Sequence, residues 1–319
     1  MPKISIIIPT FNHAAYLGQC LDSVLAQDFT DWSAVIVDDA STDGADAIIV
    51  RYTERDRRFK SIRHETNYGP AKLSLTHNEA LSSDDSEYVT VLEGDDYWPT
   101  ARLTELNASL DTNDAVLAHG DAYTFEKGKT AYFSHAFAPA VKNNLPLGAA
   151  LEYFFKCANP VIAQSAMARR KALENIGGFA QIPSLFMVDY PTWFKLAFTG
   201  RFNYIPKPLG YWRRHAQAMT VNYREKLLTG SIDFARGLYA EKRNAITSLN
   251  LDGVISGSDI GYLAEKALCR HFMENGELGK AGEAFARLSG AGAGAKKPFG
   301  DKAKEYALMI EIFIRSLFV

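Results

Sequence analysis

The first hundred residues alternate between short apolar runs and amphipathic segments. Residues 4–8 form an apolar, β-branched run that Pro9 ends, which predicts a strand. Apolar residues then recur at helical spacing, at Leu17, Leu21, Val24 and Leu25. The same two patterns alternate through residues 32–37, 45–55, 59–63, 71–81 and 88–92. This alternation predicts right-handed βαβ units and a mostly parallel sheet.

Two of the predicted strands are followed directly by clusters of carboxylates. Asp38 and Asp39 follow the second strand, and Glu93, Asp95 and Asp96 follow the run at 88–92. Open α/β sheets bind their ligands at the carboxyl ends of the strands. Crowded carboxylates repel one another unless a cation lies among them, and Mg²⁺ or Mn²⁺ prefers oxygen ligands and substrate phosphates. The pattern therefore predicts a divalent cation and a phosphate-bearing substrate.

Several other interpretations of these clusters can be weighed from the sequence. Residues 93–96 could form only an acidic turn before a helix that begins near Pro99, but the repeated layout argues against this interpretation. A calcium loop beginning at Asp39 is excluded, because its twelfth position is Val50 and a strand precedes it. The turn after the first strand has no dinucleotide or triphosphate glycine fingerprint, and no Walker motif occurs, which disfavours dehydrogenases, P-loop NTPases and nucleotidyltransferases.

Five segments carry a recognisable set of motifs: residues 6–12 (IIIPTFN), 23–27 (SVLAQ), 37–43 (VDDASTD), 67–69 (NYG) with Asn78, and 93–98 (EGDDYW). Four more follow: residues 165–170 (SAMARR), 177–179 (GGF), 188–196 (VDYPTWFKL) and 204–215 (YIPKPLGYWRRH). In this order they resemble the inverting family 2 glycosyltransferases over roughly residues 3–220. The resemblance implies an α/β fold of the GT-A type, with a mixed sheet flanked by helices.

The resemblance gives each carboxylate a separate role. It implies that Asp39 accepts a hydrogen bond from the donor nucleobase and that Asp189 is the general base. Asp95 would bind the metal that bridges the diphosphate, with His215 as a second ligand. Glu93 replaces the usual first aspartate of its motif and would reach the ribose or a metal-bound water. Further donor-binding residues are expected at Pro9, Thr10, Phe11, Asn12, Lys72, His77 and Asp96, and acceptor-binding residues at Trp98 and Arg169.

Some of these residues also have a structural interpretation. His77 stands where many relatives have an arginine, and we favour an exposed helical position for it, since lone polar residues on helices usually face solvent. For His215 we favour the site over a structural role. Asp189 could simply cap a helix over residues 190–198, but the chemistry favours a base. Trp98 is explained equally well as a core residue or as a stacking face for a sugar.

The expected chemistry requires these residue types. Displacing a nucleoside diphosphate from a sugar carbon builds negative charge on the leaving phosphate, which a metal stabilises as a Lewis acid. The acceptor hydroxyl has a pKa far above neutrality, so a carboxylate must take its proton during attack. Attack from the opposite face would invert the anomeric centre.

Composition is typical of a soluble enzyme. The chain has 319 residues, of which 47% are hydrophobic and 23% charged, enough for one large domain and an appendage. A net charge of -2 does not indicate the basic surface that nucleic-acid-binding proteins have. Cys20, Cys157 and Cys269 lie far apart, which favours a reducing cytosol over a disulfide framework or a zinc site. The first strand begins almost at once, and no apolar stretch reaches the ~20 residues of a membrane span, so we expect a cytoplasmic protein.

The pattern becomes helical beyond residue 223, with helices expected at 224–249, 258–275 and 278–288. We therefore predict a catalytic domain at 1–222, made of a nucleotide-sugar half (1–118) and an acceptor half (119–222), and a helical region at 223–319. A last helix near the C-terminus is apolar nearly all round and follows a cluster of lysines. We favour its packing on the helical region or on a second subunit over peripheral contact with the inner face of a membrane.

Together these features predict a metal-dependent inverting glycosyltransferase that uses Mg²⁺ or Mn²⁺. The donor is expected to be a UDP-sugar, and the acceptor a glycan or lipid-linked glycan of a bacterial surface polysaccharide. The alternative is a catalytically silent sugar-nucleotide or glycan-binding protein of the same fold. The joint presence of Asp39, Asp95 and Asp189 favours the enzyme. The donor sugar, the acceptor and the linkage are not encoded in these motifs.

Overall fold

The computed structural model describes residues 1–291, which form two compact units. Unit 1 comprises Met1–Ala150 and Pro160–Asn222, and unit 2 comprises Leu151–Asn159 and the chain from Tyr223 onward. One boundary thus falls at residue 222, and a short segment of the expected acceptor half groups with the helical region. The last helix expected from the sequence lies outside the described residues.

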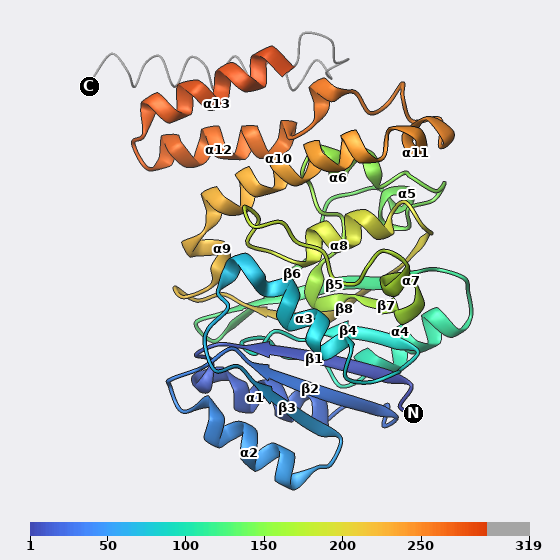
Figure 1. Cartoon of the computed structure of the whole chain (residues 1–319), viewed down its shortest axis with the longest axis vertical. Coiled ribbons are helices and arrows are strands. Elements are labelled where there is room, and N and C mark those ends of the chain that lie inside the picture. The colour runs from blue at the N-terminus through green and yellow to red at the C-terminus, as the bar shows by residue number, and fades with distance from the viewer. Residues whose placement is uncertain (292–319) are drawn as a thin grey trace. The chain divides into compact units, whose positions relative to one another are not determined.

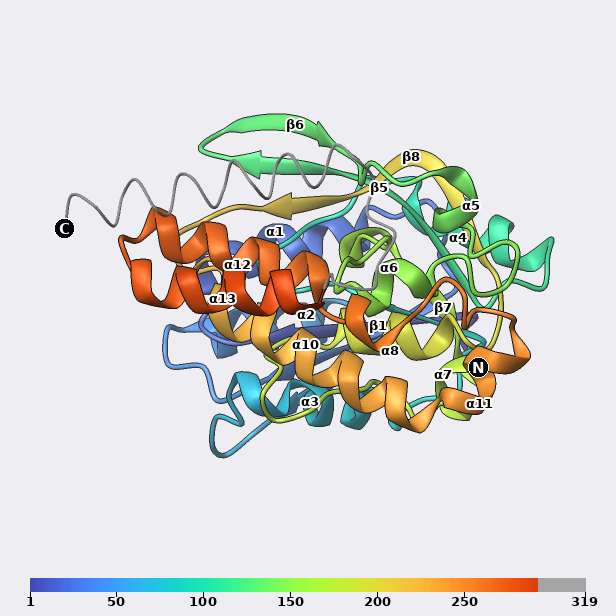
Figure 2. The same ribbon diagram turned by 90° about the horizontal axis from the view of Figure 1, so that it is seen from above.

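Unit 1 is built on a mixed sheet, as the resemblance implied (Figure 1). Its strands in the described chain are β1 (Ile4–Thr10), β2 (Trp32–Asp38), β3 (Phe59–Arg63), β4 (Tyr88–Val91), β5 (Leu117–Glu126), β6 (Lys129–Phe133), β7 (Met167–Arg169) and β8 (Phe202–Arg213). The order β3-β2-β1-β4 is parallel, and β7 then joins β4 to β5 in antiparallel fashion. Figure 2 shows the β5–β6 hairpin, with β8 running parallel along the other edge of β5.

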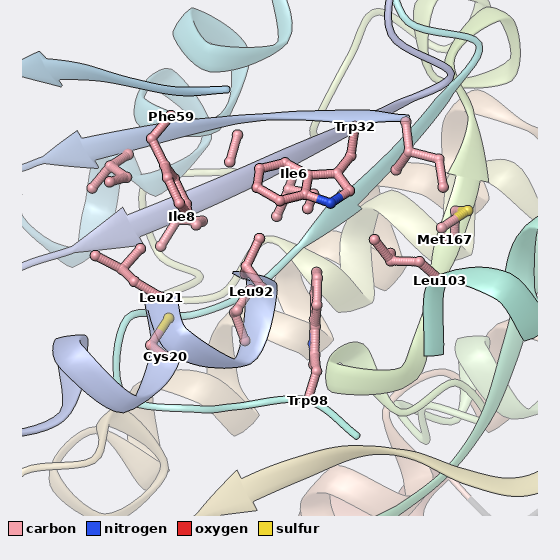
Figure 3. Packing of buried hydrophobic residues seen from close by; sticks show 14 of the residues in the cluster. Ile6, Ile8, Cys20, Leu21, Trp32, Phe59, Leu92, Trp98, Leu103 and Met167 are labelled. Atoms are coloured by element: carbon pink, nitrogen blue, oxygen red, sulfur yellow. The ribbon is translucent and has the colours of Figure 1, made fainter. Parts of the chain in front are cut away.

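Helices cover both faces of this sheet. In unit 1 they are α1 (Ala14–Leu25), α2 (Ala45–Arg55), α3 (Leu73–Leu81), α4 (Arg102–Asp111), α5 (Pro139–Lys142), α7 (Arg170–Asn175), α8 (Asp189–Leu196) and α9 (Met219–Asn222). The helices α1, α2 and α4 enclose the main core against alternate residues of β1, such as Ile6 and Ile8 (Figure 3). α3 packs on the opposite face of β1 and β2, and α8 lies on that side as well (Figure 1).

The first strand differs from the sequence prediction, because it continues through Pro9 to Thr10. The carbonyl of Pro9 accepts a hydrogen bond from the Gly94 N–H at 3.0 Å, so the ring nitrogen faces the same neighbour, β4. Pairing between β1 and β4 ends at Ile7 and Val91. Proline is tolerated at this point because no ladder partner there needs its missing N–H.

Unit 2 is helical within the described residues. Its helices are α6 (Leu151–Phe155), α10 (Arg224–Glu241), α11 (Arg243–Ser248), α12 (Tyr262–Glu274) and α13 (Leu278–Ala291). It has its own core, in which Ile232 of α10 meets Leu268 and Phe272 of α12. Up to residue 291, no helix has both the length and the apolar character needed to cross a bilayer.

Two helix boundaries in unit 2 differ from the prediction. The helix expected at 258–275 begins only at Tyr262, because Gly261 adopts a left-handed conformation with φ 79°. A Cβ at Gly261 would lie 2.9 Å from the Ile232 side chain, so a larger residue would not fit there. The helix expected at 224–249 is two helices that part at Lys242, where neither glycine nor proline marks the break.

Candidate functional site

The carboxyl ends of β1, β2 and β4 bring the two acidic clusters to one edge of the sheet. Thr10 is in register with Asp38, and the Thr10 carbonyl accepts the N–H of Asp39 at 2.9 Å. On the other side, the loop after β4 is joined to β1 through the hydrogen bond between Gly94 and Pro9. Motifs far apart in the sequence therefore meet at the position where α/β sheets bind ligands.

The loops after β1 and β2 hold each other in place. Asn12 accepts the N–H of Thr42 at its side-chain oxygen (2.8 Å) and donates its own N–H to the Ser41 hydroxyl (2.9 Å). Asp38 accepts the Ser41 N–H and is paired with Arg63. Asn12 was expected among the donor-binding residues, but its side-chain oxygen is used to join the two loops. The Asn12 side chain therefore shapes these two loops.

Asp39 is buried and already accepts several hydrogen bonds. Its Oδ1 atom receives the ring N–H of His64 at 2.7 Å and the Tyr68 N–H at 2.9 Å. Within residues 1–291, its Oδ2 atom receives only the Gly69 N–H, at the long distance of 3.3 Å. A carboxylate oxygen has two lone pairs, so Oδ2 can accept one more donor. Phe11, which was expected to border the nucleobase, is 42% exposed at the end of β1 and its ring is available for stacking.

Asp95 lies between two histidines. His215 Nε2 is 2.9 Å from Asp95 Oδ2, and His13 Nε2 is 4.0 Å from the same oxygen. Burial alone would raise the pKa of Asp95, but the hydrogen bond from His215 and the nearby ring of His13 hold it below its ordinary value. The structure thus brings together Asp95 and His215, the pair that the sequence predicted as metal ligands.

Unpaired polar atoms surround this pair. Thr10 Oγ1, His13 Nδ1 and His215 Nδ1 are buried and have no hydrogen-bond partner within residues 1–291. Gly94 permits the close packing, because a Cβ there would lie 2.7 Å from Thr10 Oγ1 and 3.0 Å from His13 Nδ1. Buried polar atoms are rarely left unpaired in proteins, so their clustering indicates a polar ligand at this place.

Asp96 corrects one of the sequence predictions. It was expected to bind the donor, but it is 2% exposed and its Oδ1 accepts the backbone N–H of Arg213 at 2.7 Å. Burial, followed by the charge of Asp95, raises its pKa well above the ordinary value. Arg213 also donates to the Asp95 carbonyl and to Gln19 of α1. Asp96 and Arg213 therefore tether the acidic loop to the end of β8.

Asp189, Glu93 and His77 form a third group of charges. Asp189 is half-buried as the first residue of α8. Burial and then the charge of Glu93 raise its pKa to about 6, against a smaller opposing effect of His77. His77 Nε2 lies 3.8 Å from Glu93 Oε1, and its Nδ1 donates to the Leu73 carbonyl at 2.8 Å.

The exposed position favoured for His77 from the sequence is wrong, since the residue is 3% exposed. Its ring lies beside Phe179, with centroids 5.2 Å apart. The neighbouring Asn78 exchanges two hydrogen bonds with the backbone of Phe179, which fixes α3 against the turn at residues 177–179. Lys72, the other cation proposed for the diphosphate, is exposed at the start of α3.

Both acceptor-binding predictions are corrected by the structure. Trp98 is 4% exposed in the main core (Figure 3), and the Arg102 guanidinium lies 3.7 Å from its ring centre. Arg169 donates to the backbone carbonyls of Leu110, Asn113 and Ala115. Trp98 is therefore a core residue, and Arg169 holds the segment between α4 and β5.

Sequence reasoning missed three residues that shape the site. No role was predicted from the sequence for His13, His64 or Arg213. His13 lies in the short loop after the first strand, so its proximity to the acidic loop could have been inferred. Nothing near His64 in the sequence indicates that it contacts Asp39, 25 residues earlier.

Comparison with known proteins identifies the family. Residues 5–177, more than half of the chain, match the model for "Glycosyl transferase family 2". A curated relative, glycosyltransferase GlyA of Streptococcus pneumoniae, is 31% identical over 133 residues, which are 42% of this chain and 18% of GlyA. A second, an uncharacterized glycosyltransferase of Haemophilus influenzae, is 36% identical over 39% of this chain and 48% of its own. The chain thus spans less than half the length of these two relatives.

Solved structures show the same fold. TarS 1-349 of Staphylococcus aureus, in complex with UDP-GlcNAc, has a TM-score of 0.60 and 22% identity, with 90% of this chain and 81% of the TarS 1-349 chain covered. The mannosyltransferase PcManGT of Pyrobaculum calidifontis, with GDP-Man and Mn²⁺, has a TM-score of 0.55 and 20% identity, with 99% and 87% covered. From the extent of the family match and the shared GT-A fold, the chain belongs to glycosyl transferase family 2.

Proposed function

We propose that this chain is a metal-dependent inverting glycosyltransferase that moves a sugar from a nucleotide donor to a hydroxyl of an acceptor glycan. The observation that carries the proposal is the grouping of Asp39, Asp95 with His215, and Asp189, which come from separate segments of unit 1. Each matches one task of the reaction: holding the nucleobase, holding the diphosphate and removing the acceptor proton.

The donor is proposed to be a UDP-sugar. Asp39 is an acceptor of hydrogen bonds, so it suits the ring N–H of uracil or guanine, whereas the corresponding ring nitrogen of cytosine is itself an acceptor. Phe11 is exposed close to the same loops and suits stacking on the base. Two proteins of the same fold support a nucleotide donor, since TarS was solved with UDP-GlcNAc and PcManGT with GDP-Man.

Asp95 and His215 fit a divalent cation. A carboxylate and an imidazole are ordinary ligands of Mn²⁺, and Mg²⁺ also accepts the carboxylate. Within the described residues no three His, Cys, Asp or Glu side chains converge as a ready-made site. This suits a cation that takes its other ligands from water and the donor diphosphate. A bound cation would neutralise the charge that develops on the leaving diphosphate.

Asp189 is proposed as the general base. Its raised pKa of about 6 leaves it ionised at neutral pH, and it makes the carboxylate a stronger base than an ordinary aspartate. Burial is the main cause of this raised pKa, and the charge of Glu93 adds to it against a smaller opposing effect of His77. Proton removal from the acceptor hydroxyl by Asp189 permits attack on the sugar carbon from the face opposite the diphosphate, which inverts the anomeric centre.

The acceptor is proposed to be a glycan or lipid-linked glycan of the cell envelope. This rests on relatives whose names refer to such polymers, among them the poly(ribitol-phosphate) β-N-acetylglucosaminyltransferase TarS. We place the reaction in the cytoplasm, where the thiols of Cys20 and Cys269, which the structure leaves unpaired, are expected to stay reduced. Peripheral membrane contact or self-association through the C-terminal segment remains a prediction from the sequence alone.

The proposal is tested by incubating the protein with single nucleotide sugars, Mn²⁺ and a panel of glycan acceptors. We expect UDP release that requires Mn²⁺, together with a product whose new linkage has the inverted configuration by NMR. A product with retained configuration would contradict the mechanism. Tight binding of UDP-sugars in thermal-shift assays without transfer or hydrolysis would favour a silent binding protein instead.

A further inference from the structure

His64 is a buried histidine with a carboxylate on each side of its ring. Its Nδ1 atom is 2.7 Å from Asp39 Oδ1, and its Nε2 atom is 2.9 Å from Glu79 Oε2. A carboxylate only accepts hydrogen bonds, so both ring nitrogens must carry protons to satisfy both contacts. The geometry therefore describes an imidazolium between two anions.

Tyr68 completes this arrangement. Its ring is stacked on the His64 ring, with centroids 4.0 Å apart and an angle of 22° between the planes. Its backbone N–H donates to the same Asp39 oxygen that His64 contacts. The Tyr68 ring covers one face of the histidine ring. Tyr68 as a whole is 37% exposed, so it also presents an aromatic side chain to solvent.

These contacts leave one oxygen of the Asp39 carboxylate, Oδ2, able to accept a further hydrogen bond. Oδ1 already accepts two hydrogen bonds, from His64 and from the Tyr68 N–H. Among the described residues, Oδ2 accepts only the long one from the Gly69 N–H. The Asp39 side chain is 10% exposed, so little room exists for it to rotate. His64 thus fixes which carboxylate oxygen remains for a ligand.

We propose that His64, charged through Glu79, is a positioning residue that makes Asp39 selective for nucleobases with a ring N–H. The inference rests on the proposed function, because it deepens the assignment of Asp39 to the donor base. A fixed, ionised carboxylate accepts from uracil or guanine and opposes the ring nitrogen of cytosine, which cannot donate.

The charge state fits this role. Burial alone would lower the pKa of His64, but the hydrogen bonds to Asp39 and Glu79 raise it above its ordinary value. Charge-assisted hydrogen bonds are stronger than neutral ones and hold their partners in one orientation. Glu79 is 43% exposed, so its replacement removes the outer anion with little disturbance of the core.

The test compares four variants with the wild type by calorimetric binding of UDP, GDP and CDP in the presence of Mn²⁺. His64→Leu removes both contacts, and His64→Asn keeps a neutral donor near the Nδ1 position. Glu79→Gln removes the outer anion only. Glu65→Gln, at an exposed neighbouring acid, removes one charge from the same segment and is the matched control. Pyrophosphate with Mn²⁺ serves as a ligand that has the diphosphate but no base.

We expect His64→Leu to weaken binding of the preferred nucleotide by roughly tenfold or more, which is typical for loss of a hydrogen bond to a charged group. CDP and pyrophosphate binding should change by less than about twofold, so the ratio of UDP to CDP affinity collapses. His64→Asn should restore part of this ratio, and Glu79→Gln should reduce it to an intermediate value. Glu65→Gln should keep the wild-type ratio.

Two failures can be told apart. If the wild type binds UDP or GDP better than CDP and the His64 and Glu79 variants keep that ratio, the proposed role of His64 is wrong. An equal loss for all nucleotides and pyrophosphate would show a merely structural role and also overturn it. If the wild type binds no nucleotide, the proposed function itself fails. Should His64→Leu not fold, an unchanged ratio in both His64→Asn and Glu79→Gln is sufficient to reject the inference.

Discussion

At the scale of single residues, the charge of Asp189 controls the proposed reaction. Its pKa of about 6 means that it gains a proton as the pH falls through this value. A base must be unprotonated, so turnover at saturating donor and acceptor should rise with pH around 6 and level off above it. Asp189→Asn should lower turnover by roughly 10² to 10⁴, the usual contribution of a general base. Near-normal turnover in this variant would refute the assignment.

The same pKa predicts the effect of Asp189→Asn on stability. The folded state raises this pKa, so it binds the proton more tightly than the unfolded chain does. The stabilising effect is complete at acidic pH below the unfolded pKa and is lost as the pH rises through about 6. Asn cannot ionise and caps as well as Asp, so Tm at pH 8 should stay equal or rise. A clear fall in Tm at pH 8 would contradict the raised pKa of Asp189.

Asp95 gives a second prediction at this scale. Asp95→Asn keeps the size of the side chain but removes the charge that would attract a cation. In the presence of UDP, Mn²⁺ should raise the Tm of the wild type and fail to do so for the variant. Asp85→Asn, at an exposed position, is the control and should respond like the wild type. An undiminished Mn²⁺ response in Asp95→Asn would exclude Asp95 as a ligand.

The motifs identified the segments of the site better than the orientation of each side chain. The acidic clusters with Asp39 and Asp95 were expected at one edge because they follow strands of the same sheet, and His215 was expected there from the family resemblance. Asp96 and Arg169 also lie in motifs of the family, but their side chains form hydrogen bonds with backbone atoms of other segments. The partner of Asp96 is Arg213, 117 positions away in the chain, and no local pattern encodes such a contact. His77 was placed wrongly for the same reason, because Phe179 covers it.

At the scale of elements, the junction between β1 and the loop after β4 depends on Gly94. A Cβ there would lie 2.7 Å from Thr10 Oγ1 and 2.9 Å from Thr10 Cβ, closer than packed atoms allow. Gly94→Ala should therefore displace the loop that carries Asp95 and reduce both Tm and Mn²⁺-dependent UDP binding. Gly18→Ala is the matched control, because nothing lies within 4 Å of that position in α1. It should raise stability by about 0.5 to 1 kcal/mol. Equal behaviour of the two variants would contradict the packing argument.

Helices and strands with a regular apolar pattern were easier to predict than elements whose position depends on contacts between distant parts of the chain. The strands β1 to β4 and helices α1 to α3 were predictable, since their apolar periodicity reflects burial on a regular sheet. β8 was harder, because its register with β5 shifts twice between Gly120 and Tyr123. Its residues are therefore partly exposed and do not alternate regularly. The local sequence pattern also does not predict that residues 151–159 group with helices that come much later in the chain.

At the scale of the whole molecule, every residue assigned to catalysis or donor binding lies in unit 1, whereas unit 2 has a separate core. Two units with separate cores need not unfold in one step. A ligand that binds unit 1 adds about 2.7 kcal/mol to the stability of that unit when present at a hundred times its dissociation constant. UDP with Mn²⁺ should therefore raise the unfolding transition that includes the site.

The last prediction tests whether the site depends on unit 2. Phe272 is 4% exposed in the core of unit 2, so Phe272→Ala should destabilise this unit by roughly 3–5 kcal/mol. Because no assigned residue lies there, the dissociation constant of UDP with Mn²⁺ should stay within about twofold of the wild type by calorimetry. Val254→Ala, at a 46% exposed position of the same unit, should change neither quantity. A fall in UDP affinity that parallels the loss of stability would show that the donor site requires an intact unit 2.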